Sequence, residues 1–90
     1  MADVEIVTHG DGEYEVNIRG GDGSTSHTLL LDAAQAASGG QLADDERTAR
    51  ATIAYLLEHQ DAGDLPQLID LEEVLAAYEG ATERIVALRE

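Results

Sequence analysis

Hydrophobic and polar residues alternate along the first third of the chain with a period of two residues. The alternation runs through residues 3–8 (DVEIVT), residues 13–19 (EYEVNIR) and residues 26–31 (SHTLLL). A period of two is typical of a β-strand with one buried and one solvent-exposed face. The residues expected to share the inward-facing side are Val4, Ile6, Thr8, Tyr14, Val16, Ile18, His27, Leu29 and Leu31.

Asp-Gly pairs separate the three predicted strands. One lies in residues 9–12 (HGDG) and the other in residues 20–23 (GGDG). Gly and, less readily, Asp tolerate the positive φ angles of tight turns, so Asp-Gly between two alternating runs predicts a hairpin. We therefore expect a three-stranded antiparallel meander.

The hydrophobic pattern becomes helical after Asp32. Helices are predicted over residues 33–38, 45–60, 70–79 and 81–89. Together with the strands, they indicate an α+β fold in which the helices pack on one face of the sheet. At 90 residues the chain is expected to form a single domain, residues 1–90.

Capping residues support two of these helix starts. Asp44 or Asp45 precedes the long second helix and is placed to accept hydrogen bonds from its first turn. Asp70 and Glu73 have the spacing of a capping box at the start of the third. Gly80 either ends that helix or only weakens a helix that continues through it.

The composition excludes or disfavours several kinds of covalent cross-link, metal site and ligand. Cysteine is absent, which excludes disulfides, zinc–thiolate sites, iron–sulfur clusters and thiol nucleophiles. Phe and Trp are absent and only three Tyr are present, which disfavours ligands with large rings. No apolar run reaches the roughly 18 residues of a membrane span, and the N-terminus lacks the pattern of a signal peptide. We expect a cytoplasmic protein without membrane association.

The charge is strongly negative: 19 acidic residues face five arginines, lysine is absent, and the formal net charge is −14. Direct binding to nucleic acid needs the opposite sign. Three interpretations stay open: solubility or adaptation to salt, attraction to a basic protein partner, and imitation of the charge of DNA.

The stretch RGGDGSTSH (residues 19–27) resembles a ligand-binding loop only superficially. A phosphate loop needs a lysine, which this chain lacks, and a dinucleotide loop opens a helix, whereas a strand follows here. Counted from Asp22 as a calcium loop, the sixth position, which needs glycine, holds His27, and the twelfth position, which needs an acidic residue, holds Ala33. A polar turn is the simplest interpretation.

The three histidines do not form a predicted metal or catalytic site. We expect His9 and His27 to lie at opposite ends of the second strand, about 20 Å apart at about 3.3 Å per residue. His59 lies at the end of the long helix, where the helix dipole favours an imidazolium. Because His27 shares a face with Leu29, we expect a histidine satisfied by a backbone carbonyl. The sequence predicts no catalytic, cofactor-binding or metal-binding residue.

Three segments resemble a group of small uncharacterised acidic bacterial proteins: STSHTLLLD, IAYLLEHQ and LIDLEEVLAAYEG. The resemblance covers about residues 13–80, and the chain departs from the group near Tyr78 and Gly80. It implies the same α+β order and no activity. The composition is acidic and rich in alanine, and it contains arginine but no lysine. Such a composition suits a GC-rich bacterium or a salt-loving organism.

These observations favour a non-catalytic protein-interaction or regulatory module without a cofactor. Two surfaces are candidates for the partner. One is the outer sheet face with its free edges, where another strand, such as that of a second copy, could add. The other is an acidic helical surface that could meet a basic protein. The alternatives are a small enzyme or ligand-binding protein that uses His27 with Ser26 or Thr28, and a DNA mimic. The predicted acidic surface consists of Glu72, Glu73, Glu79 and Glu83.

Overall fold

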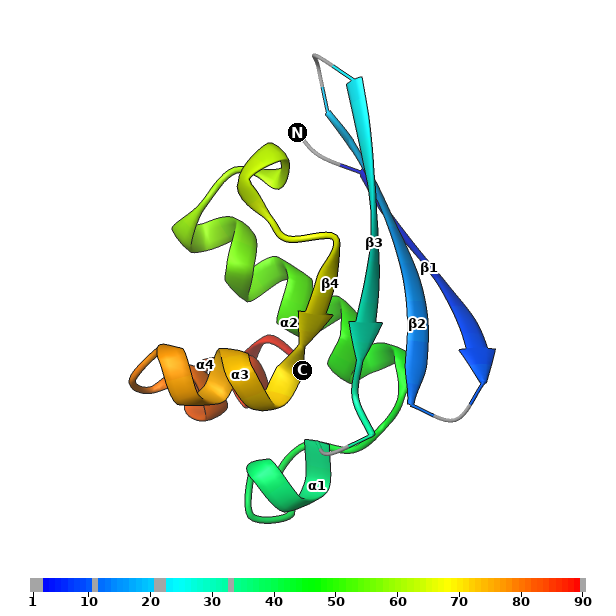
Figure 1. The fold of residues 1–90 in the computed structure, drawn as a ribbon. Coiled ribbons are helices and arrows are strands. Elements are labelled where there is room, and N and C mark those ends of the chain that lie inside the picture. The colour runs from blue at the N-terminus through cyan, green and yellow to red at the C-terminus, as the bar shows by residue number, and fades with distance from the viewer. Residues whose placement is uncertain (1–2, 11, 21–22, 33, 90) are drawn as a thin grey trace.

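The computed structural model describes residues 3–10, 12–20, 23–32 and 34–89. It has the predicted α+β architecture, with a sheet formed by the first third of the chain and helices packed against one of its faces (Figure 1). Ala33, at the start of the first predicted helix, and Asp11, Gly21 and Asp22, in the two predicted turns, lie outside the described residues.

The sheet contains the three predicted strands and a fourth short one. Strands β1 (Asp3–Gly10), β2 (Glu13–Gly20) and β3 (Gly23–Leu30) form an antiparallel meander, as expected. Strand β4 (Leu68–Asp70) was not foreseen and pairs parallel to β3, so that the sheet order is β1-β2-β3-β4. The parallel pairing is possible because the intervening helices bring the chain back across the sheet.

The predicted alternation fixes which face of the sheet is buried. Ile6, Tyr14, Val16, Ile18 and Leu29 are all buried. Their partners in the helical layer are mainly aliphatic, as expected for a chain without Phe or Trp. The alternating side chains between them point to the opposite face, which carries none of the helices α2 (Glu46–His59), α3 (Leu71–Ala77) and α4 (Ala81–Leu88) (Figure 1).

The helices follow the predicted ranges with small shifts at their ends. They are α1 (Ala34–Ala37), α2 (Glu46–His59), the 3₁₀ turn η1 (Ala62–Asp64), α3 (Leu71–Ala77) and α4 (Ala81–Leu88). Asp45 caps α2 and accepts a hydrogen bond from the Thr48 N–H at 2.8 Å. Asp70 caps α3 and accepts from the Glu72 N–H at 3.0 Å.

Gly80 separates the last two helices. Its φ angle of +79° lies in the left-handed region, which glycine adopts without the strain that a side chain introduces. Helix α3 ends before it and α4 begins after it, at Ala81. Of the two alternatives that the sequence left open, the structure therefore shows the interruption.

Arginine side chains tie the helices to one another and to the sheet. Arg84 donates two hydrogen bonds to the Glu58 carboxylate, at 2.6 and 3.2 Å, which link α4 to α2. Arg89 pairs with Asp45 at 3.1 Å. Burial raises the pKa of the Asp45 carboxyl, but the hydrogen bonds from Thr48 and the charge of Arg89 outweigh burial and hold the pKa below its ordinary value.

Tyr14 makes a polar contact that crosses the two layers. Its hydroxyl donates a hydrogen bond of 2.7 Å to the carboxylate of Asp44, in the segment before α2. Burial, together with this bond and the negative charge of Asp44, raises the pKa of Tyr14 well above its ordinary value of 10.0. The folded protein therefore keeps the phenol proton at a pH where the unfolded chain has lost it.

We expect the free energy of unfolding to fall as the pH rises above 10, the ordinary pKa of tyrosine. Unfolding then releases a proton, so alkaline solution favours the unfolded state. Urea unfolding between about pH 9 and pH 11 checks this, with Tyr14→Phe as the matched control because it lacks the titrating group. Equal pH slopes for the two proteins would contradict the assignment.

Candidate functional site

His27, the histidine singled out from the sequence, is held inside the structure by two hydrogen bonds. Its Nδ1 lies 2.8 Å from the Pro66 carbonyl oxygen, and its Nε2 lies 2.9 Å from the Thr25 hydroxyl. Since a carbonyl only accepts, Nδ1 carries the proton and donates, and in the neutral ring Nε2 accepts from Thr25. The side chain is 5% exposed. The expectation of a histidine satisfied by a backbone carbonyl is confirmed. Its expected place at the end of the second strand is wrong, because His27 pairs with Val16 in the middle of β2.

These bonds place His27 at the point where β4 joins the sheet. Pro66 precedes β4, and the next carbonyl, that of Gln67, accepts from the Thr28 N–H at 2.7 Å. The His27 ring thus holds Pro66, and the first backbone bond of the β3–β4 ladder holds the next residue, Gln67. His27 is a positioning residue for the crossover that brings β4 beside β3.

Ser26 and Thr28, the other members of the hypothetical site, lie on the opposite face of β3. The Ser26 hydroxyl donates to the Asn17 side chain at 2.8 Å, and Asn17 donates to Glu15 at 3.0 Å. Glu15 in turn lies 3.2 Å from the Nε2 of His9. The structure therefore separates His27 from the adjacent hydroxyls, and instead forms a polar chain across three strands on the uncovered face.

The uncovered face of the sheet is acidic. The alternation of the strands places Asp3, Glu5, Glu13 and Glu15 on it, together with one arginine, Arg19. Among the described residues, Glu5 and Glu13 have no ion-pair partner. A shallow cavity of about 220 Å³ lies there, lined by His9, Glu13, Tyr14, Glu15 and Thr28.

Two exposed apolar side chains flank this acidic centre. Val7 of β1 is 42% exposed and Leu68 of β4 is 58% exposed. Both belong to one row across the sheet, in which Val7 is paired with Glu15, Glu15 with Thr28, and Thr28 with Leu68. The row runs from one edge of the sheet to the other and is apolar at both ends. Sequence reasoning missed it because it depends on the register of β4.

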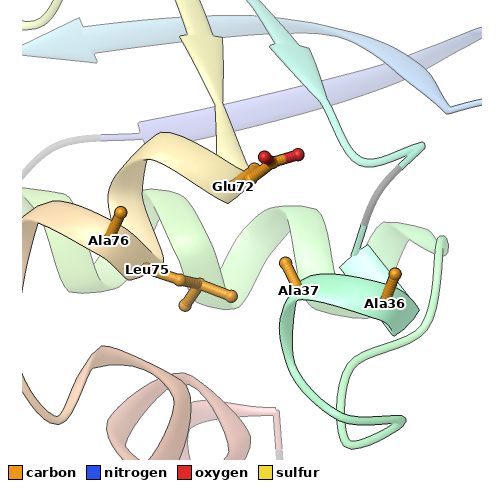
Figure 2. A pocket seen from close by; sticks show the side chains of 5 residues that line it. All are labelled: Ala36, Ala37, Glu72, Leu75 and Ala76. Atoms are coloured by element: carbon orange, nitrogen blue, oxygen red, sulfur yellow. The ribbon is translucent and has the colours of Figure 1, made fainter.

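The predicted acidic helical surface is exposed but does not converge on one cavity. Glu72 borders a cavity of about 400 Å³ between α1 and α3, where Figure 2 shows Leu75 reaching toward Ala37. Glu73, one residue later, borders a different groove, beside β4. Glu79 lies between α3 and α4, and Glu83 lies in the first turn of α4. The four residues remain a predicted surface.

An aromatic cluster joins α2 to the end of α3. The rings of Tyr55, His59 and Tyr78 lie 4.6 to 5.7 Å apart between centroids, and Gln60 donates to the Tyr78 hydroxyl at 3.2 Å. His59 was expected only to complement the helix dipole, and the structure adds this packing. The spacing of Tyr55 and His59, four residues apart on a helix, was the available signal.

The described residues contain no group of three or more His, Cys, Asp or Glu side chains placed to hold a metal ion. No helix among the same residues is long and apolar enough to cross a membrane.

Comparison of the chain with protein-family models, with curated proteins and with solved structures found no match.

Proposed function

We propose that this protein is a small non-catalytic interaction module whose uncovered sheet face receives a basic protein partner. The observation that carries the proposal is the composition of that face, with four acidic residues against one arginine. Charge complementarity of this kind increases the rate of encounter and selects partners of opposite sign.

The apolar ends of the cross-strand row indicate a protein rather than a small ion. A partner lying along the row covers Val7 and Leu68, the two exposed large hydrophobic side chains of the described structure, and meets Glu15 between them. Apolar contact at two sites with a charged centre is a common composition of protein interfaces.

Arginine compensates the charge of this face only in part, because Arg19, opposite Asp3 on the neighbouring strand, is the one arginine that the strands place on it. Arg50, Arg84 and Arg89 form ion pairs with Glu46, Glu58 and Asp45. These pairs involve α2, α4 and the residues next to them, whereas the carboxylates of Glu5 and Glu13 lie on the sheet. The negative charge of the uncovered face is thus available to a partner.

The bonding of His27 supports a role without catalysis. Both ring nitrogens are engaged with Pro66 and Thr25, and the hydroxyls of Ser26 and Thr28 lie across the strand from the ring. A nucleophile and its general base must be within hydrogen-bond reach of each other, which excludes Ser26 and Thr28 as nucleophiles for His27. The Thr25 hydroxyl is within reach, but the ring that it meets belongs to a residue only 5% exposed. The contacts of His27 instead serve the folding of β4.

Site-specific photocrosslinking in the cells that express the protein tests the proposal. A benzophenone amino acid is placed at Thr28, in the middle of the uncovered face, and, as the matched control, at Ala87, an exposed position on α4. We expect a basic protein to be captured from position 28 and not from position 87. The purified partner should then bind the Glu5→Gln, Glu13→Gln double variant about ten-fold more weakly.

Two results would count against this function. One is equal capture of the same protein from both positions, which removes the sheet face from the interaction. The other is a captured partner whose affinity is unchanged by the two substitutions. Capture of a DNA-binding protein that is displaced by duplex DNA would instead support DNA mimicry.

A further inference from the structure

The two edges of the sheet differ in how far they are protected against a further strand. The register places the outward N–H and C=O groups of β1 on Val4, Ile6 and Thr8. Arg50 donates to the Val4 carbonyl at 3.1 Å, and an irregularity in the pairing follows Thr8. A charged side chain over the edge and a bulge are two devices that block edge-to-edge pairing. Strand β1 is therefore protected against pairing with a further strand.

Strand β4 has an accessible edge. The Thr28 N–H donates to the Gln67 carbonyl, which fixes the hydrogen-bonding pattern of the parallel ladder. In this pattern the backbone N–H and C=O of Ile69 point toward β3, and those of Leu68 point away from β3. Ile69 is buried whereas Leu68 is 58% exposed, so solvent reaches β4 at Leu68, whose side chain lies on the uncovered face. The backbone groups of Leu68 are those of an edge strand that accepts another strand.

A groove of about 170 Å³ runs beside this edge, between β4, the end of α2 and α3. Its walls are mainly apolar and include Leu56, Val74, Ala77 and Tyr78. Two carboxylates, Asp70 and Glu73, also line it, and the lining contains neither arginine nor histidine. Asp70 caps α3, while Glu73 has no ion-pair partner among the described residues.

We infer that the edge of β4 receives an extended segment of a partner protein, which pairs with the backbone of Leu68 and inserts an arginine or lysine side chain into the groove beside Glu73. Side chains next to the paired residue point to the helical side of the sheet, where the groove lies. The apolar walls and the Tyr78 ring suit the aliphatic stem and the cation, and Glu73 supplies the opposite charge. This inference rests on the proposed function, because it takes the partner to be a protein.

The test is a titration of the folded ¹⁵N-labelled protein with a blocked peptide, acetyl-Thr-Val-Thr-Arg-Thr-Val-Thr-amide. Binding is measured from the NMR chemical shifts of the backbone amides. The matched peptide carries citrulline, the neutral analogue, in place of arginine. We expect saturable shifts of the Leu68 and Asp70 amides, and an affinity for the citrulline peptide that is about ten-fold weaker. Glu73→Gln should weaken binding of the arginine peptide to a similar degree and leave the citrulline peptide unaffected.

Two substitutions at one position separate backbone pairing from side-chain contact. Leu68→Pro removes the outward N–H without removing a bond to β3, and should weaken binding at least about ten-fold. Leu68→Ala keeps the N–H and should bind more tightly than Leu68→Pro. An unchanged pattern of native amide shifts away from residue 68 shows that each variant is folded.

Several outcomes would overturn the inference. The β4 edge is not the site if millimolar peptide causes no amide shifts, or if both peptides bind equally. The same holds if the shifts are confined to β1 or to the uncovered sheet face. Concentration-dependent broadening at β4 without peptide would show that a second copy occupies the edge. A failure of the crosslinking test at Thr28 leaves these results unaffected, so the two proposals fail separately.

Discussion

Replacing His27 by alanine is expected to lower the free energy of unfolding by about 2–4 kcal/mol. The substitution removes both hydrogen bonds of the ring and leaves the Pro66 carbonyl without its partner beneath β4. It also leaves a cavity where a side chain only 5% exposed had been packed. Because Pro66 and the bond from Thr28 to Gln67 lie side by side, pairing of β4 with β3 should weaken first.

Urea unfolding measures this change, and His9→Ala is the matched control. His9 lies on the uncovered face beside Glu15, with both side chains nearly half exposed, so its loss should cost less than about 1 kcal/mol. Hydrogen exchange of the Ile69 amide reports on β4 directly and should accelerate in His27→Ala. Unchanged stability with lost partner binding would show instead that His27 belongs to a functional site.

Replacing Gly12 by alanine is expected to destabilise the protein by about 3 kcal/mol or more. A Cβ atom at this position would lie 2.7 Å from the Asp32 Cβ, 2.8 Å from its Cα and 2.9 Å from its backbone nitrogen. Its φ angle of +75° adds the strain of a left-handed residue. Since two of the three clashing atoms are backbone, the conflict is relieved only by moving the chain, which also disturbs the bond from the Leu31 N–H to the Gly12 carbonyl.

Gly20→Ala provides the matched control for this substitution. A Cβ at Gly20 meets nothing within 4 Å, and the residue does not have a positive φ angle. Its replacement should therefore change the unfolding free energy by less than about 0.5 kcal/mol. If the two variants unfold at the same urea concentration, the close approach of the first turn to Asp32 is not present in solution.

Local patterns were sufficient for most of the fold. The alternation through Tyr14, Val16 and Ile18 identified the buried face of the sheet, because a period of two leaves no other face for these side chains. The Asp45 and Asp70 caps located the starts of α2 and α3 within one residue, because a cap is a contact between neighbours in the sequence.

Contacts between distant residues were not predictable in the same way. Strand β4 has three residues, too few to show a period, and it is stabilised by Thr28 and His27, about 40 residues earlier. The candidate surfaces share this limitation. The row from Val7 to Leu68 and the groove beside Glu73 exist only once β4 is placed next to β3.

The central claim is that an acidic face binds a basic protein, and the affinity for the crosslinked partner at low and high ionic strength tests it most directly. Attraction between exposed charges is screened within about 10 Å at 0.1 M salt. We predict that the affinity falls as salt rises from about 0.05 to 0.5 M, and that the fall is smaller for the Glu5→Gln, Glu13→Gln double variant. An affinity that is independent of salt in both proteins would contradict the claim.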